Sequence, residues 1–295
     1  MARGYTTRRL EVFALHAHTA TKDRINYETL FQLLSRIRKE NRIHEADGKI
    51  IAIPTLQVKG VFATLVAYEG ERGLHPLVYN TVSATERVER LQTSEIMATR
   101  THAIINLSTR EAVIEYNHRG AKAYDIALTL QGLAQSASAY RDITIELNPV
   151  VTEDFAKQID RFDRIRVASV KVSRPNFDWN ATYNELTKAA KESDAHDIEV
   201  SMVAERGGSL SKKQGLLKFI KSLTKSEVLS IFKSATITGE REGEREETTL
   251  SLSHYIEHQK VRVRRDESGH VDDKDVTKQI GEYINSRIIT TGLRQ

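Results

Sequence analysis

The sequence predicts an α+β fold with two mixed domains, whose sheets are largely antiparallel or mixed. At 295 residues the chain is at or past the size at which one hydrophobic core stops growing. Alternating apolar segments typical of strands are separated irregularly, by turns in some places and by helical patterns in others. This irregular spacing argues against a doubly wound parallel sheet. The pattern changes near Tyr140, so we expect an N-terminal domain over 1–140 and a C-terminal domain over 141–295.

The first domain is predicted to begin with a strand and a capped helix. The segment from Leu10 to His18 alternates as a strand does, and Asn26 is a suitable N-cap for a helix that continues to about Arg42. The pair Asp47-Gly48 indicates a hairpin turn. The other elements expected here are strands at 50–53, 58–68, 103–107 and 112–116, a surface helix with a loop at 84–97, and a helix at 121–137.

The second domain is predicted to alternate between short strands and helices. Gly207-Gly208 ends one strand, and Ser209 or Ser211 can cap the helix that follows. A charged, glycine-containing turn at 239–247 separates two β segments. The expected strands lie at 143–147, 164–173, 198–203, 235–238, 248–253 and 260–264, and the expected helices at 153–162, 180–191, 209–223, 225–233 and 272–289.

Composition excludes several classes of protein. Cys is absent, which excludes disulfides and thiolate metal sites and suits a reducing compartment. The basic N-terminus lacks the apolar segment of a signal peptide, and the longest apolar stretch, Val61 to Tyr68, is far too short to span a bilayer. We therefore expect a cytoplasmic protein without membrane insertion. The net charge of +4 permits binding to nucleic acid without requiring it.

No complete catalytic or metal-binding motif is present. His16 and His18 share one side of the first strand without a nearby third ligand, and His254 and His258 lack the H-E-x-x-H glutamate. Gly207-Gly208 precedes lysines but matches no phosphate-binding loop. We expect no cofactor, no bound metal and no catalytic residue. A metal-dependent nuclease remains an alternative, with candidate carboxylates at Glu199, Glu205 and Asp272 to Asp275.

Basic residues form three groups, all in the predicted second domain. In the first, cations alternate with Val261 and Val263, so that a strand with its valines inward presents its cations outward. A solvated, salt-bridged surface explains any single group better, because Glu and Asp are abundant. Three groups in one domain make nucleic-acid binding a comparable explanation. They comprise Lys260, Arg262, Arg264 and Arg265; Arg161, Arg164, Arg166, Lys171 and Arg174; and Lys212, Lys213, Lys218, Lys221 and Lys225, while Trp179 and Tyr183 could stack on bases.

The order of elements in the second domain resembles a module of bacterial phage-exclusion and phage-defence proteins. The segments that carry the resemblance are 143–149, a short helix ending in Ile159-Asp160-Arg161-Phe162, the strand 165–172, and 250–263. Relatives of this kind include the phage lambda Rex exclusion protein A and the B component of the Kiwa system. The resemblance implies a non-enzymatic, dimeric DNA-binding protein of a defence or exclusion system. It carries over no catalytic residue.

These observations lead to one main expectation and two alternatives. We expect a largely sequence-independent DNA-binding protein that contacts phosphates, with duplex DNA as the partner and a homodimer as the assembly. The first alternative is the metal-dependent nuclease. The second is a sensor of infection whose first domain recognises a protein partner through the mixed-charge segment Thr85 to Met97.

Overall fold

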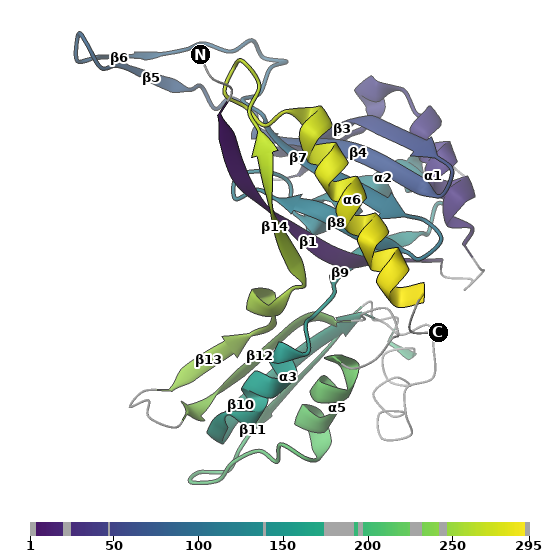
Figure 1. Ribbon diagram of the computed structural model, residues 1–295, viewed down its shortest axis with the longest axis vertical. Coiled ribbons are helices and arrows are strands. Elements are labelled where there is room, and N and C mark those ends of the chain that lie inside the picture. The colour runs from purple at the N-terminus through teal and green to yellow at the C-terminus, as the bar shows by residue number, and fades with distance from the viewer. Residues whose placement is uncertain are drawn as a thin grey trace. The chain divides into compact units, whose positions relative to one another are not determined.

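The protein has an α+β fold built from antiparallel sheets (Figure 1). The computed structural model describes residues 4–19, 25–46, 48–137, 140–173, 192–193, 197–224, 232–241 and 247–292. The chain divides into two units. Unit 1 comprises Met1–Glu11, Leu15–Leu147 and His258–Gln295, and unit 2 comprises Val12–Ala14 and Asn148–Glu257.

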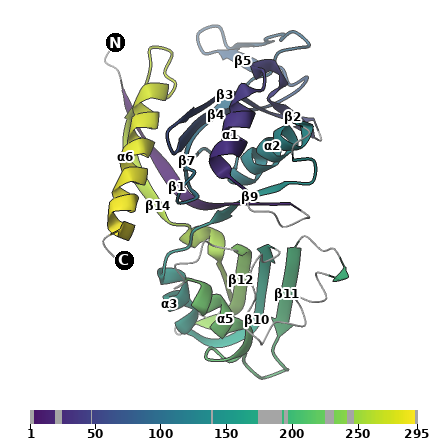
Figure 2. The ribbon, with the colours of Figure 1, turned by 90° about the vertical axis from the view of Figure 1, so that its right-hand side faces the viewer.

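Unit 1 is organised around a long antiparallel sheet. Its strands follow the order β14-β1-β8-β7-β4-β3-β2, and β9 pairs with β1 beside this path. Figure 2 shows helix α6 on one face of the sheet and helices α1 and α2 on the other. The elements are β1 (Tyr5–His18), α1 (Tyr27–Arg36), β2 (Ile43–Ala46), β3 (Lys49–Lys59), β4 (Phe62–Glu71), β7 (Thr99–Asn106), β8 (Glu111–Tyr116), α2 (Ala123–Ser136), β9 (Thr144–Pro149), β14 (His258–Arg264) and α6 (Asp273–Gly292).

Helix α1 begins where the sequence predicts and ends earlier. The Asn26 side chain accepts a hydrogen bond from the amide of Thr29 at 3.0 Å, which confirms the predicted N-cap. The helix stops at Arg36 instead of continuing to Arg42. Its end is fixed by the buried guanidinium of Arg42, which donates to the carbonyl oxygens of Ser35 (2.5 Å) and Ile37 (2.8 Å). These carbonyls would otherwise lack partners at the end of the helix.

The prediction of a surface helix at 84–97 is wrong. Strands β5 (Leu77–Asn80) and β6 (Thr85–Val88) form a two-stranded hairpin that extends away from the main sheet of unit 1 (Figure 1), and we call residues 77–88 the hairpin arm. The turn is stabilised by the Asn80 side chain, which accepts hydrogen bonds from the amides of Val82 and Ser83. Ala84 completes it with a positive φ of 51°.

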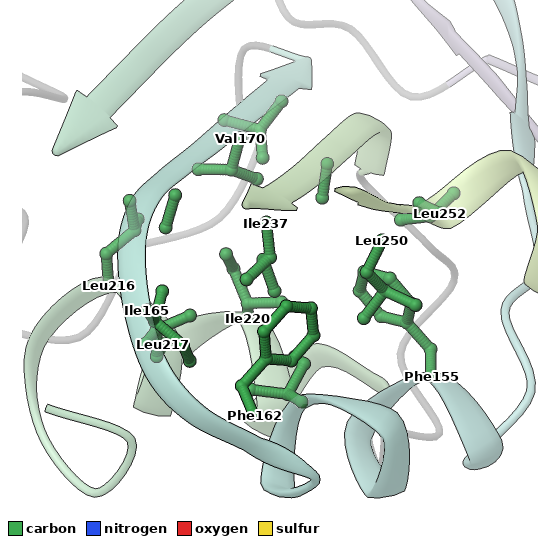
Figure 3. Packing of buried hydrophobic residues seen from close by; sticks show 14 of the residues in the cluster. Phe155, Phe162, Ile165, Val170, Leu216, Leu217, Ile220, Ile237, Leu250 and Leu252 are labelled. Atoms are coloured by element: carbon green, nitrogen blue, oxygen red, sulfur yellow. The ribbon is translucent and has the colours of Figure 1, made fainter. Parts of the chain in front are cut away.

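Unit 2 is a four-stranded antiparallel sheet packed against two helices. The strand order is β11-β10-β12-β13. Phe155, Phe162 and Ile220 are fully buried, and they pack with branched side chains from β10 and β12 to form the core (Figure 3). The elements are α3 (Asp154–Asp160), β10 (Phe162–Ser173), β11 (Asp197–Val203), α5 (Gly215–Thr224), β12 (Phe232–Arg241), β13 (Thr248–Ser251) and the short 3-10 helix η3 (Leu252–Tyr255).

Helix α5 begins later than the sequence suggested. It starts at Gly215, so neither Ser209 nor Ser211 caps it. Ser209 instead accepts a hydrogen bond from the amide of Ile165 at 2.9 Å, which ties the preceding loop to β10. The helix expected at 180–191 lies outside the described residues, as does most of the helix expected at 225–233.

The last segment of the chain belongs to unit 1, whereas the sequence placed it in a C-terminal domain over 141–295. Strand β14 pairs antiparallel with β1, at the opposite end of the sequence. Val263, Val276 and Ile280 are fully buried there, and this burial explains why the segment completes unit 1. Within the described ranges, no helix is long and apolar enough to cross a membrane.

Candidate nucleic-acid interface

Strand β14 has the alternation that the sequence predicts. Val261 and Val263 are buried, while Lys260, Arg262 and Arg264 are exposed between and beside them. Successive residues of a strand point to opposite faces, so the three cations form one row. The spacing along this row is about 7 Å, two residues of extended chain.

Strand β1 widens this row in a way that the sequence analysis missed. In the antiparallel register Arg9 lies opposite Lys260, and Tyr5 lies opposite Arg264. Directly opposed residues share a face of the sheet, so Arg9 joins the three cations. We define the β1–β14 face as Tyr5, Arg9, Lys260, Arg262 and Arg264. The expected strand began at Leu10, which left Arg9 out of its alternating pattern.

Aromatic rings lie among these cations. The Arg262 guanidinium carbon is 4.6 Å from the centroid of the Tyr5 ring. The neighbouring strand β8 ends at Tyr116, whose ring lies 5.7 Å from the guanidinium carbon of Arg9 and 4.9 Å from Nζ of Lys122. Cation–π contacts of this length are attractive and orient the charged groups on the surface.

Carboxylates neutralise only part of this positive surface. Arg9 pairs with Glu11 (Nε to Oε1, 3.0 Å), and Arg264 pairs more loosely with Asp275 (Nη2 to Oδ1, 3.6 Å). Lys260 and Arg262 have no carboxylate partner in the part of the chain that the structure describes. Burial raises the pKa of the Glu11 carboxyl, and the nearby charges of Arg9, His258 and Lys122 act in the opposite direction.

Arg265 lies just beyond this face. It follows the last residue of β14, and its side chain donates to the carbonyl oxygen of Gly269 at 2.6 Å across the turn before α6. Its role in the structure is therefore to hold that turn. We leave it out of the β1–β14 face.

The second predicted group, in unit 2, is largely paired with carboxylates. Arg161 is exposed at the end of α3, and Arg174 lies outside the described residues. The other three have acidic partners, as expected for the solvated, salt-bridged surface that was the alternative to nucleic-acid binding. Arg164 pairs with Glu240 (3.1 Å), Arg166 with Glu247 (2.5 Å) and Lys171 with Asp197 (3.1 Å).

The third group is divided between internal bonds and solvent. Lys212 donates to the carbonyl oxygen of Asp160 at 3.0 Å, and Lys221 pairs with the carboxylate of the same residue. Lys213 and Lys218 are exposed. Lys225 lies outside the described residues, as do Trp179 and Tyr183, the side chains proposed to stack on bases.

The three groups do not lie in one unit. The row on β14 belongs to unit 1, whereas the other two groups belong to unit 2. The three groups are therefore not gathered in one domain, and their number does not favour nucleic-acid binding. The β1–β14 face is the strongest candidate because it combines aligned cations, exposed rings and incomplete neutralisation.

The Asp272 to Asp275 carboxylates of the nuclease alternative have structural partners, whereas Glu205 is exposed in the loop after β11. The Asp272 side chain accepts hydrogen bonds from the amides of Lys274 and Asp275, and this local bonding lowers its pKa. Asp273 pairs with Arg100, and Glu199 lies opposite Lys171 in the sheet of unit 2. Among the described residues, no group of three or more His, Asp or Glu side chains could hold a metal ion.

Neither of the two histidine pairs belongs to a possible metal site among the described residues. His254 lies in η3, and His258 begins β14, so the two residues do not share a helix. His16 and His18 lie within β1 and are half-buried.

The comparisons with known proteins assign no function to this chain, so a function has to be proposed from the sequence and the geometry of the site. No protein-family model matches this chain, and no curated protein matches it either.

Proposed function

We propose that the protein is a non-enzymatic, largely sequence-independent DNA-binding protein, with duplex DNA as the partner that the sequence analysis expects. The observation that carries the proposal is the register of β1 and β14, which places the half-buried Arg9 beside the exposed row of Lys260, Arg262 and Arg264. Cations at intervals of about 7 Å along a strand can contact successive phosphates of a backbone. Such contacts carry no base information, so binding would depend little on sequence.

Neutralising two of these cations tests the proposal. Lys260→Gln with Arg262→Gln is the suitable variant, because neither side chain has a carboxylate partner among the described residues. Each lost phosphate contact reduces the slope of log K against log salt by about 0.9, so the pair should reduce it by nearly 2. Fluorescence anisotropy with a labelled duplex at several salt concentrations measures both affinity and slope.

A matched control comes from unit 2. Lys213→Gln with Lys218→Gln removes the same charge from two exposed lysines of unit 2, which carries no member of the β1–β14 face. This control should change affinity and slope much less than the test variant does. If both double variants weaken binding equally, net charge and not this face governs the interaction. Including Mg²⁺ in one series tests the nuclease alternative, which requires loss of intact substrate.

A role in antiphage defence or exclusion rests on the sequence resemblance and on a DNA-binding activity that would suit it. We propose that the protein has this role and that it acts in the cytoplasm. Phage plating on cells that express the protein, compared with cells that express the Lys260→Gln, Arg262→Gln variant, tests it. Equal plating on both strains, and on cells without the protein, would remove the proposal.

The exposed arm favours a second proposal, that two copies of this chain associate. Leu77, Tyr79 and Val88 share one face of the arm and are 62 %, 60 % and 55 % exposed. A two-stranded hairpin is marginally stable in water unless it packs against something else. The charges of β6 and the residues after it are balanced, with Glu86 and Glu89 against Arg87 and Arg90. In a two-fold symmetric dimer the same surface of each copy faces the other, so acidic residues of one arm can pair with basic residues of the other arm.

Light scattering measures this association directly. We expect a dimer for the native chain, and a monomer when Leu77, Tyr79 and Val88 are all replaced by Ser. The arm contributes no buried side chain to unit 1, so the variant should keep its unfolding temperature. A native chain that is monomeric at high concentration would exclude the proposal.

A further inference from the structure

Two exposed tyrosines accompany the cations of the β1–β14 face. Tyr5 is 54 % exposed and Tyr116 is 41 % exposed, so neither ring serves mainly to fill the core. Tyr5 lies four residues before Arg9 on β1, about 13 Å along an extended strand. Arg9 in turn approaches the ring of Tyr116 on the adjacent strand β8. The rings and cations therefore form one continuous surface across three neighbouring strands.

Each ring is held by a cation from a different element. Arg262 of β14 packs on Tyr5, and Lys122, which precedes α2, packs on Tyr116. The Lys122 ammonium is itself fixed by the carbonyl oxygens of Asn117 and His118. The cations cover part of the rings and fix their orientation, so a flat ligand that stacks on the exposed remainder of each ring costs it little freedom. The guanidinium plane of Arg262 can extend the same stacking surface.

A stacked duplex does not offer its base faces to such a surface. Within a duplex the faces of the bases contact one another, and only their edges are accessible from the grooves. Unpaired bases expose their faces, and aromatic side chains beside a positive groove are the usual means of binding them. We propose that the β1–β14 face and the adjoining Tyr116 bind unpaired nucleotides, with bases stacked on Tyr5 and Tyr116 and phosphates contacted by the exposed Lys260 and Arg262.

This inference rests on the proposed nucleic-acid binding and deepens it: the cations can contact the phosphates of a duplex, and a single-stranded segment binds more tightly because its bases can also stack on the rings. Stacking of this kind is tolerant of sequence, since every base has a face that can stack. Single-stranded DNA and RNA share this chemistry. The test distinguishes the two.

The experiment compares labelled oligothymidylate, oligouridylate and a blunt duplex of equal length by fluorescence anisotropy. We expect the native chain to bind one of the single strands more tightly than the duplex. Tyr5→Ala and Tyr116→Ala should each weaken single-strand binding by about 5-fold to over 100-fold, the effect of losing one base–aromatic stack. The salt slope should stay unchanged, because the phosphate contacts remain.

Phenylalanine variants serve as controls. Tyr5→Phe and Tyr116→Phe keep the stacking surface and should bind as the native chain does. Binding that prefers the duplex and ignores both alanine changes, but is lost in the Lys260→Gln, Arg262→Gln variant, would overturn this inference and leave the proposed function intact. Failure of all three oligonucleotides to bind at low salt would overturn both.

Discussion

At the scale of single residues, Glu11 is the most informative position on the candidate interface. Its carboxylate lies 3.0 Å from Arg9 and neutralises the cation that extends the row from β14 to β1. Glu11→Gln should therefore strengthen nucleic-acid binding several-fold at low salt, because it removes a negative charge beside the row of cations, and the gain should shrink as salt screens this charge. Anisotropy titrations of native and variant proteins measure this gain. Weaker binding by the variant would show that Glu11 positions Arg9 productively.

The same residue gives a pH-dependent stability. Burial raises the pKa of Glu11 in the folded state above its unfolded value of about 4.3. Its contribution to the free energy of unfolding is thus greatest below the unfolded pKa and is lost as pH rises through the folded pKa. Relative to the native chain, Glu11→Gln should become progressively more stable as pH rises through this window. Urea unfolding of both proteins at several pH values measures the difference, and a constant difference would contradict the assignment.

At the scale of elements, α6 is held to the sheet of unit 1 through its first turn. The Asp273 carboxylate lies 2.6 Å from Nη1 of Arg100 and 3.0 Å from Nε2 of the buried His102. The other ring nitrogen of His102 lies 2.7 Å from Glu115. Asp273→Ala leaves two polar side chains without this acceptor, which should cost about 1–3 kcal/mol of unfolding free energy.

Chemical denaturation monitored by circular dichroism measures this cost. The matched control is Lys274→Ala at the next position, where the side chain is exposed and we expect a change within about 0.5 kcal/mol. Equal effects of the two substitutions would mean that the Asp273 contacts do not hold the helix.

Local elements were easier to predict than the contacts between them. The Asn26 cap and the alternation of Lys260 to Arg264 depend on nearest neighbours in the chain, and the structure contains both. The hairpin arm was missed because every residue of its strands is exposed, so their sequences lack the alternation that burial of one face imposes. The pairing of β14 with β1 joins the two ends of the sequence, and nothing local to either strand specifies it.

In the candidate site, too, local patterns could be predicted from the sequence, whereas contacts between elements could not. The β14 cations were found from their alternation, whereas Arg9 and Tyr116 join them only through sheet pairing and ring contacts. The unit 2 cations were equally prominent in the sequence, but their pairing with Glu240, Glu247 and Asp197 depends on strand register and loop position. A sequence shows where charge is, and tertiary structure decides which charge is neutralised.

At the scale of the whole molecule, the C-terminal segment determines where the chain can be divided. Residues 258–295 supply β14 and α6 to unit 1, and Val263, Val276 and Ile280 are fully buried there. A fragment of residues 1–147 would therefore expose the sheet face that α6 covers and lose the strand that carries the cations. Exposed apolar surface of this kind promotes aggregation. We expect this fragment to show no cooperative thermal transition by circular dichroism.

Restoring the missing segment should rescue the fold. Joining residue 147 to residue 258 through a flexible linker re-creates unit 1 and also keeps Val12–Ala14, the three residues of β1 that group with unit 2. We expect this chain to unfold cooperatively and to bind nucleic acid through the β1–β14 face, since every member of that face lies in unit 1. Cooperative unfolding of the fragment 1–147 alone would show that the boundary expected near residue 140 is a true domain boundary. Loss of binding in a well-folded linked chain would instead show that unit 2 contributes to the interface.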